Sequence, residues 1–341
     1  MSLIETIIDI PIEHGVNVFG ELDSNFKKIE KFLHVTIIAR NSEVKIIGGE
    51  DAVARGKKVL SQLIELSKRG NDIIEQNVDY ALSLSMESSA AKLNSSDLSK
   101  DALLEIDGDV ICRTISGKPI KPKTLGQKQY VDKIRNKMIV FGIGPAGTGK
   151  TYLAMAMAIN AFKNNEVGRI ILTRPAIEAG ESLGFLPGDL QSKVDPYLRP
   201  LYDALYQIMG AESFLQNTEK GLIEVAPLAY MRGRTLDNAY IILDEAQNTT
   251  PAQMKMFLTR IGFGSKVIIT GDLTQKDLPI GATSGLDIGA RVLRKIDDIG
   301  FSYLTSQDVV RHPLVQKIVK AYEEYEARPN KDPKNTKRRG R

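Results

Sequence analysis

The segment MIVFGIGPAGTGKTYLA, residues 138–154, decides the fold of this chain. Its first residues are apolar and β-branched, which predicts a strand covered on both faces. Its centre, Gly144 to Thr151, fits G-x-x-x-x-G-K-[ST], a pattern that binds nucleoside triphosphates. The residues that follow, TYLAMAMAINAF, are good helix formers. Because strand, loop and helix occur in the order that a phosphate-binding loop requires, we favour this interpretation over a chance glycine-rich turn.

The loop carries the groups that a triphosphate needs. Glycines at 147 and 149 let the backbone approach phosphates without Cβ clashes. Backbone amides at a helix start attract anions. We expect Lys150 to reach the β- and γ-phosphates and Thr151 to ligate Mg²⁺, which makes ATP and Mg²⁺ the expected ligands. The loop residues predicted to bind the nucleotide are Gly144, Pro145, Ala146, Gly147, Thr148, Gly149, Lys150, Thr151 and Tyr152.

A second strand, in AYIILDEAQNTT (239–250), ends in two carboxylates. A carboxylate at the C-terminal end of such a strand lies beside the phosphate loop. We expect Asp244 to hold Mg²⁺, directly or through water, and Glu245 to orient and deprotonate the attacking water. The alternative is an acidic cap for the helix that begins at Pro251, although Thr250 is a better N-cap candidate. The pattern favours Mg²⁺-dependent hydrolysis of ATP.

A third strand, in KVIITGDLTQKDLP (266–279), completes a recognisable set. In this order and spacing, GPAGTGKT, DEAQ and GDLTQ resemble motifs one, two and three of superfamily-one helicases. The resemblance implies that Gln275 contacts the γ-phosphate or the attacking water, and that Asp272 links this contact to the neighbouring motif.

In those helicases, a glutamine about twenty residues before the loop reads adenine, since an amide both donates and accepts hydrogen bonds. The corresponding stretch here is TLGQKQYVDKI. Gln127 is our choice and Gln129 the close alternative. A plain surface helix start is the remaining interpretation.

Longer stretches of the sequence narrow the resemblance from helicases in general to one family. The strings ILTRPAIEAGESLGFLPGDLQSKVDPYLRPLYDAL, PLAYMRGRTL and IILDEAQNTTPAQMKMFLTRIGFGSK are similar to the PhoH-like ATPase family, whose founding member is associated with phosphate starvation. The similarity covers most of 105–325. It implies an α/β fold, a RecA-like P-loop NTPase domain with a parallel sheet, preceded by a small α+β domain of KH type. KH domains bind RNA through a GXXG loop. No GXXG occurs between residues 10 and 80, so a role in assembly is the alternative.

Four parts are expected along the chain. Residues 1–80 alternate as strand, helix, hairpin and helix, which predicts the small KH-like domain. Residues 81–104 are rich in serine and predict a linker. Residues 105–328 predict the ATPase domain, entered through a small hairpin. Residues 329–341 predict a basic, disordered tail that would add RNA affinity or only solubility.

Strand and helix alternate in the main domain, which is typical of a mostly parallel sheet with helices on both faces. A strand between the phosphate loop and the acidic motif is typical of P-loop ATPases that use a glutamate base, and 169–173 falls there in sequence. The candidate strands are 138–143, 169–173, 240–243, 267–270 and 301–304.

Composition excludes several classes of protein. The chain of 341 residues has a net charge of +4 and 26% charged residues, ordinary values for a globular protein. Its single cysteine, Cys112, excludes an intramolecular disulfide and a multi-cysteine metal site. The three histidines have no metal-ligand spacing. No apolar run approaches a membrane span, and the N-terminus does not resemble a secretory signal, so we expect a cytoplasmic protein without membrane contact.

The motifs found so far include no arginine that would stabilise the charge of the transition state. In the helicases a second RecA-like domain supplies it, and the residues after Pro279 are too few for such a domain. An arginine finger contributes about 10³–10⁵ in rate. We therefore expect a neighbouring copy to supply it in a ring, a hexamer being favoured. Arg311 is the first candidate; Arg174, Arg232 and Arg234 are the others, with a salt bridge or substrate contact as the alternative role.

Two functions compete. The first is an RNA-directed ATPase, a helicase or remodeller, favoured by the helicase-like motifs, the KH-like domain and the basic tail. The second is a nucleotide-dependent switch or assembly factor for a protein partner such as a nuclease or ribosome-associated factor. A small-molecule kinase fits poorly, since no acceptor lid is recognisable. The long segment 174–200, rich in proline and glycine, predicts either a channel lining or a structural flap.

Overall fold

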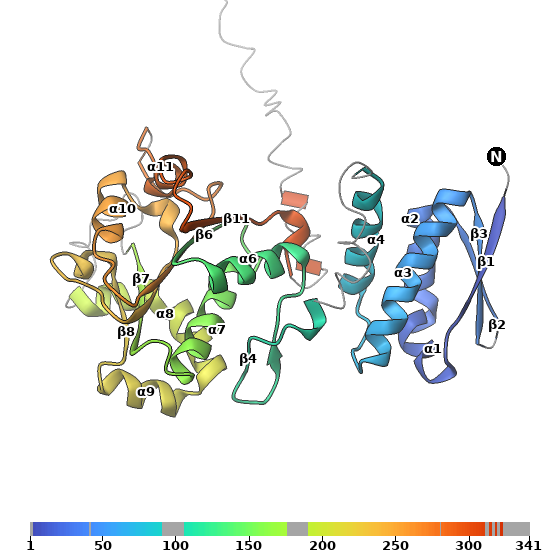
Figure 1. Cartoon of the computed structure of the whole chain (residues 1–341), viewed down its shortest axis with the longest axis horizontal. Helices are drawn as coiled ribbons and strands as arrows, with labels where there is room; N and C mark the ends of the chain where they lie inside the picture. The colour runs from blue at the N-terminus through green and yellow to red at the C-terminus, as the bar shows by residue number, and fades with distance from the viewer. Residues whose placement is uncertain are drawn as a thin grey trace, which may run out of the picture.

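A six-stranded, all-parallel sheet forms the centre of the larger part of the molecule (Figure 1). The computed structural model describes residues 3–40, 42–90, 106–175, 190–279 and 281–310, and the single residues 314, 315, 318, 321 and 322. The strand order is β11-β6-β10-β9-β7-β8. The strands are β6 (Ile139–Ile143), β7 (Arg169–Arg174), β8 (Ile223–Pro227), β9 (Ala239–Leu243), β10 (Lys266–Gly271) and β11 (Ile299–Tyr303). The predicted α/β class with a parallel sheet is confirmed.

All five strands expected from the sequence are present, and two points differ. β8 was not expected, because IEVAP is short and ends in proline. The strand that lies in space between the loop strand β6 and the acidic strand β9 is β10, whereas β7 lies on the far side of β9. The inserted strand typical of these ATPases is therefore 266–271, which carries Asp272 at its end, and not 169–173.

Helices cover both faces of this sheet, and alternate residues of each strand serve each face. On one face, Val140, Ile242 and Ile268 share a core with helices α6 to α9. On the other, Phe141, Ile241 and Ile269 share a core with α10 and α11. The helices are α6 (Leu125–Asn136), α7 (Lys150–Lys163), α8 (Leu190–Met209), α9 (Ala211–Glu219), α10 (Pro251–Leu258) and α11 (Gly285–Val292). The capping box of Thr250 at α10 confirms its expected N-cap role.

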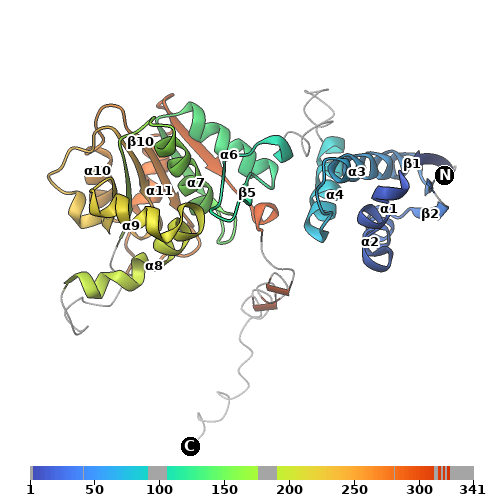
Figure 2. The same cartoon turned by 90° about the horizontal axis from the view of Figure 1, so that it is seen from below.

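A small domain precedes this unit (Figure 2). Its three-stranded antiparallel sheet has the order β1-β3-β2, and helices cover one face of it (Figure 1). The elements are β1 (Ile4–Asp9), α1 (Ile12–Phe19), η1 (Glu21–Asp23), α2 (Ser24–Leu33), β2 (Thr36–Arg40), β3 (Glu43–Gly48), α3 (Glu50–Lys68) and α4 (Glu75–Ala90). The expected small α+β domain and its hairpin are confirmed, while α1 was missed. KH-type binding stays a prediction.

The region between the two units corrects one expectation. Residues 81–90, predicted to belong to a serine-rich linker, form the second half of α4. Ala81, Leu82 and Ser85 are buried there, because the small and apolar side chains give the helix a face that packs on the N-terminal core. The rest of the predicted linker, 91–104, and the predicted tail, 329–341, lie outside the described residues.

The expected entry hairpin is present and leads into α6. β4 (Cys112–Arg113) pairs with β5 (Pro119–Ile120) in antiparallel register. Ile111 and Ile120 join the core beneath α7, so the hairpin is anchored on the ATPase side. Among the described residues, none of the helices combines the length and apolar character needed to cross a lipid bilayer.

Candidate active site

The phosphate loop lies between the end of β6 and the start of α7. Gly147 and Gly149 have φ angles of 82° and 76°. Residues with a Cβ rarely adopt such angles, so glycine is required at both positions. α7 begins directly after Gly149, at Lys150. Its first amides and its dipole therefore face the space above the loop, which is the arrangement that binds phosphate.

Lys150 is held over this loop by backbone groups. Its Nζ donates to the carbonyls of Gly144 at 2.6 Å and Pro145 at 2.8 Å. Thr148, which is fully buried, donates from Oγ1 to the same carbonyl of Pro145 at 2.9 Å. The ammonium is therefore held where triphosphate oxygens would lie. Tyr152, in the first turn of α7, packs against the apolar core.

Thr151 and Asp244 meet beside the loop. Thr151 Oγ1 donates to Asp244 Oδ1 at 2.6 Å, and Thr270 Oγ1 donates to the same oxygen at 2.7 Å. Hydroxyl and carboxylate oxygens are the ligands that Mg²⁺ prefers, so this pair fits the ion. Within the described residues no group of three or more His, Cys, Asp and Glu side chains is suited to hold a metal. The other Mg²⁺ ligands would therefore be phosphate and water oxygens, as is usual for this ion.

Glu245 follows Asp244 in an unusual backbone conformation. Its φ is 51°, in the left-handed region that residues with a Cβ seldom occupy. Such conformations cost about 1–3 kcal/mol and cluster at functional sites. The carboxylate contacts two side chains: Gln247 Nε2 donates to Oε2 at 2.5 Å, and Arg174 lies 3.3 Å from Oε1. The backbone thus turns the carboxylate away from the strand and into a polar cluster.

Gln247 is a site residue that the sequence reasoning missed. Only 1% of it is exposed. Its Oε1 accepts from the amide of Asp272 at 3.0 Å, while Asp272 Oδ2 accepts from the amide of Ala146 in the phosphate loop at 3.2 Å. A hydrogen-bonded path therefore runs from Glu245 through Gln247 and Asp272 to the loop. Gln247 is the last residue of the DEAQ motif, so its place in that motif could have identified it.

Gln275 lies on the loop that follows β10. Its side chain is exposed, and it makes no hydrogen bond to other described residues; its backbone amide donates to the carbonyl of Asp272. The direct link from this motif to the phosphate loop comes from Asp272. The role of Gln275 at the γ-phosphate stays a prediction.

Gln127 touches the phosphate loop, and Gln129 does not. Gln127 is 3% exposed, and its Nε2 donates to the carbonyl of Thr148 at 3.0 Å. Its Oε1 accepts from the amide of Lys123 at 2.7 Å. Both ends of the amide are thus used within the protein, so reading of adenine would require an exchange of partners. Gln129 lines a small cavity on the other side of α6's first turn.

The candidate arginines fall into different surroundings. Arg174 lies beside Glu245 and also donates to the carbonyl of Tyr197 at 3.0 Å. Arg234 is in a two-point ion pair with Glu224, and these hydrogen bonds raise the pKa of its guanidinium. Arg232 is exposed. Arg311, our first finger candidate, and 176–189 of the proposed channel segment lie outside the described residues.

Comparison with known proteins finds similar sequences over most of the chain. A family model described as PhoH-like protein matches residues 119–323. A PhoH-like protein of Bacillus subtilis is 52% identical over 311 residues, which cover 91% of this chain and 94% of that protein. Another, from Mycobacterium bovis, is 51% identical over 323 residues, with 95% and 89% covered. Protein PhoH of Escherichia coli is 47% identical over 207 residues, with 60% and 58% covered.

A solved structure, the SWI2/SNF2 ATPase core of Sulfolobus solfataricus in complex with dsDNA, gives a TM-score of 0.27 at 17% identity, over 43% of this chain and 31% of that one. That likeness is too distant to support a conclusion. The strand order, with β10 between β6 and β9, and the phosphate loop are those of a P-loop ATPase fold. Together with the family match, they show that this chain belongs to the PhoH-like protein family.

Proposed function

We propose that this protein hydrolyses ATP with Mg²⁺. The observation that carries the proposal is the hydrogen bond of 2.6 Å from Thr151 Oγ1 to Asp244 Oδ1, with Glu245 next in the chain. These residues lie at the C-terminal ends of the parallel strands, where the phosphate loop also lies. A hydroxyl, a metal-binding carboxylate and a second carboxylate that does not contact the first are the groups that transfer of a phosphoryl group to water requires.

Each residue has a defined part in this reaction. The loop amides and Lys150 would hold the phosphates, and Thr151 and Asp244 would hold Mg²⁺, which would supply positive charge to offset that of the transferring phosphoryl group. Glu245 accepts the proton of the attacking water on its carboxylate as the water oxygen bonds to the γ-phosphorus and the bond to ADP breaks. Gln275 would contact the γ-phosphate, and Gln127 the adenine, as the helicase resemblance implies.

Substitution of Glu245 tests the reaction. Glu245→Gln keeps the shape of the side chain and removes the base, so hydrolysis should fall about 100-fold or more while ATP still binds. Glu219→Gln, an exposed position at the end of α9, is the matched control and should keep the wild-type rate. Unchanged phosphate release by Glu245→Gln would rule out Glu245 as the base.

We further propose that hydrolysis is coupled to RNA. The support is the helicase-like motif set, the small N-terminal domain and the basic sequence at 331–341. The test compares ATPase rates with and without single-stranded RNA at low salt, where phosphate contacts are strongest. A rate that RNA does not change, together with no RNA binding, would contradict this coupling.

The transition state also needs a positive charge beyond Lys150, which supports a ring with an arginine supplied in trans. A hexamer is the arrangement we favour, and Arg311 the first candidate. Arg311→Ala and Glu245→Gln proteins should each be inactive. Mixed, they should regain activity, because a Glu245→Gln subunit brings an intact Arg311 to a neighbour with an intact Glu245. An Arg311→Ala protein with the wild-type rate would remove this residue from the site.

A nucleotide-dependent switch is the second candidate function. It is favoured by a contact between the N-terminal domain and α6, the helix that carries Gln127, in which Tyr80 of α4 accepts a hydrogen bond from the amide of Leu125. Capture of a protein partner in ATP but not ADP, without stimulation by RNA, would favour this function over the first.

A further inference from the structure

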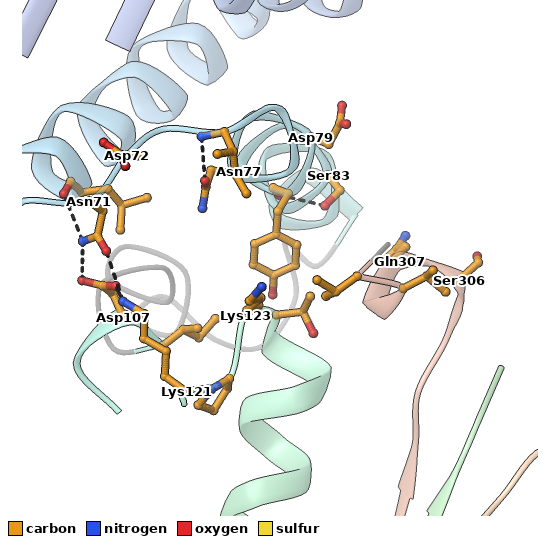
Figure 3. A pocket seen from close by; sticks show the side chains of 18 of the residues that line it. Asn71, Asp72, Asn77, Asp79, Ser83, Asp107, Lys121, Lys123, Ser306 and Gln307 are labelled. Atoms are coloured by element: carbon orange, nitrogen blue, oxygen red, sulfur yellow. Dashed lines mark hydrogen bonds and ion pairs between the residues drawn. The ribbon is translucent and has the colours of Figure 1, made fainter. Parts of the chain in front are cut away.

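A cavity of about 570 Å³ lies between α4 of the N-terminal domain and the segment that enters α6 (Figure 3). One wall comes from the N-terminal domain between Asn71 and Ser83. The other comes from Lys118–Thr124 and Ser306–Val310. The volume lies in the range of small-molecule sites, which occur preferentially at domain interfaces.

This cavity adjoins the phosphate loop. Val310 of its wall donates from its backbone amide to the carbonyl of Gly147 at 3.0 Å. Thr124, also in the wall, accepts from the amide of Gln127, whose side chain bonds to Thr148. Val310 thus bonds directly to the loop, and Thr124 is connected to it through Gln127. A nucleotide whose phosphates occupy the loop has its nucleoside end within reach of this cavity.

The N-terminal domain reaches this site through Tyr80. The side chain is 9% exposed, and its hydroxyl accepts from the amide of Leu125, the first residue of α6. Amides in the first turn of a helix have no partner within the helix, so Tyr80 supplies one that would otherwise be missing. α6 is the helix that presents Gln127 to the loop. The tyrosine also lines a second cavity, of about 190 Å³, on its other side.

The wall of the cavity carries both acidic and basic side chains. On one side, Asn71, Asp107 and Lys121 form a connected cluster, whereas Lys123 lies near the middle (Figure 3). Burial, together with the nearby Lys118 and Lys121, lowers the pKa of Lys123. Among the described residues no carboxylate forms an ion pair with it. Lys123 is exposed, and its amino group can donate hydrogen bonds to the ribose hydroxyls or ring nitrogens of a nucleoside.

We propose that this cavity receives the base and ribose of the nucleotide held by the phosphate loop, so that α4 of the N-terminal domain forms part of the nucleotide site. The proposal rests on ATP binding at the loop. It places a purine nucleoside between the two domains, in contact with the face of α4 that carries Tyr80 and Ser83. Nucleotide release then frees α4 from one of its contacts, which couples the N-terminal domain to the nucleotide state.

Photochemical labelling with 8-azido-ATP tests this placement directly. The azide on the purine reacts with whatever lies beside the base. Trypsin cleavage after Arg69 and Lys92 isolates the segment 70–92, which contains the α4 wall. We expect label in this segment, and excess ATP should remove it. Label confined to other segments would overturn the proposal while leaving ATP binding intact. Failure to bind ATP at all would instead overturn the proposed function and this inference with it.

A variant that fills the cavity gives an independent test. Ser83→Trp places a large ring where Ser83 lines both cavities. The affinity for ATP should fall about tenfold or more, whereas inorganic tripolyphosphate, which has no nucleoside, should bind within about twofold of wild type. Met86→Trp is the control, since Met86 is 45% exposed on the same helix and lines neither cavity. Equal ATP affinity in both variants would overturn the proposal.

Discussion

The guanidinium of Arg174 lies 3.3 Å from the carboxylate of Glu245. The two residues follow neighbouring strands, since β7 pairs with β9, and each stands at the C-terminal end of its strand. The guanidinium of Arg174 also donates a hydrogen bond to the carbonyl of Tyr197 in α8. The proposed base is thus positioned by a residue that connects it to α8, whose first half lies within the segment 174–200.

Removal of Arg174 should lower the rate more than the affinity. Arg174→Ala leaves the carboxylate free to leave its position, so we expect kcat to fall about tenfold and KM for ATP to change by less than about threefold. Arg174→Lys should restore only part of the rate, because a lysine lacks the planar fork. Arg169→Ala, at the opposite end of β7, is the control. A large rise in KM with unchanged kcat would instead place Arg174 on the nucleotide.

Gln247 should connect hydrolysis to the phosphate loop. Gln247→Ala removes its bonds to Glu245 and to the amide of Asp272, which leaves a buried donor without its partner. We expect kcat to fall about tenfold or more, with ATP affinity within about threefold, as measured by phosphate release and nucleotide titration. Gln216→Ala, exposed on α9, should behave as wild type. Wild-type kcat in Gln247→Ala would show that the hydrogen-bonded path from Glu245 to the loop does not contribute to hydrolysis.

Local signals explain what the sequence predicted well. The apolar run before Gly144 and the helix formers after Thr151 act over short distances, so β6, the loop and α7 were all expected. The missed helix α1 has the sequence IEHGVNVF, in which a glycine and two valines weaken helix propensity; packing of Val18 in the N-terminal core overrides it. Tertiary context rather than local preference decides this element.

Relations between strands could not be predicted in the same way. That β10 lies between β6 and β9 is a property of the whole sheet, and no window of sequence contains it. This order brings Asp272 to the loop amide of Ala146 and lets Gln247 bridge it to Glu245. The motif letters therefore indicated which residues matter, but not that Asp272 would bond directly to the loop amide of Ala146 or that Gln247 would connect it to Glu245.

The Mg²⁺ requirement should report on the pair Thr151 and Asp244. Asp244→Asn removes a charged oxygen ligand, so the Mg²⁺ concentration for half-maximal ATPase activity should rise about tenfold or more. Thr270→Val removes only the hydroxyl that orients Asp244, and the rise should be smaller. Thr259→Val is the control, since its hydroxyl donates to carbonyls of α10 and accepts from the guanidinium of Arg260, away from the site. An unchanged Mg²⁺ dependence in Asp244→Asn would exclude this carboxylate as a ligand.

Gly142 should be intolerant of any side chain, because β6 passes close to a buried ring. A Cβ at this position would lie 2.7 Å from Cε2 of Tyr130, which is fully buried on α6 and donates to the carbonyl of Lys150. Gly142→Ala should therefore destabilise the fold by about 1–3 kcal/mol and lower Tm by several degrees in a thermal melt. Gly108→Ala, where no atom lies within 4 Å, is the control.

A double variant can show that the aromatic ring of Tyr130 causes the destabilisation. If the methyl group clashes with Tyr130, then Gly142→Ala combined with Tyr130→Leu should be less destabilised than the sum of the two single variants, since the smaller side chain makes room. Additive losses would mean that the two residues do not meet, and a Gly142→Ala Tm within about 1 °C of wild type would contradict the close packing of β6 on α6.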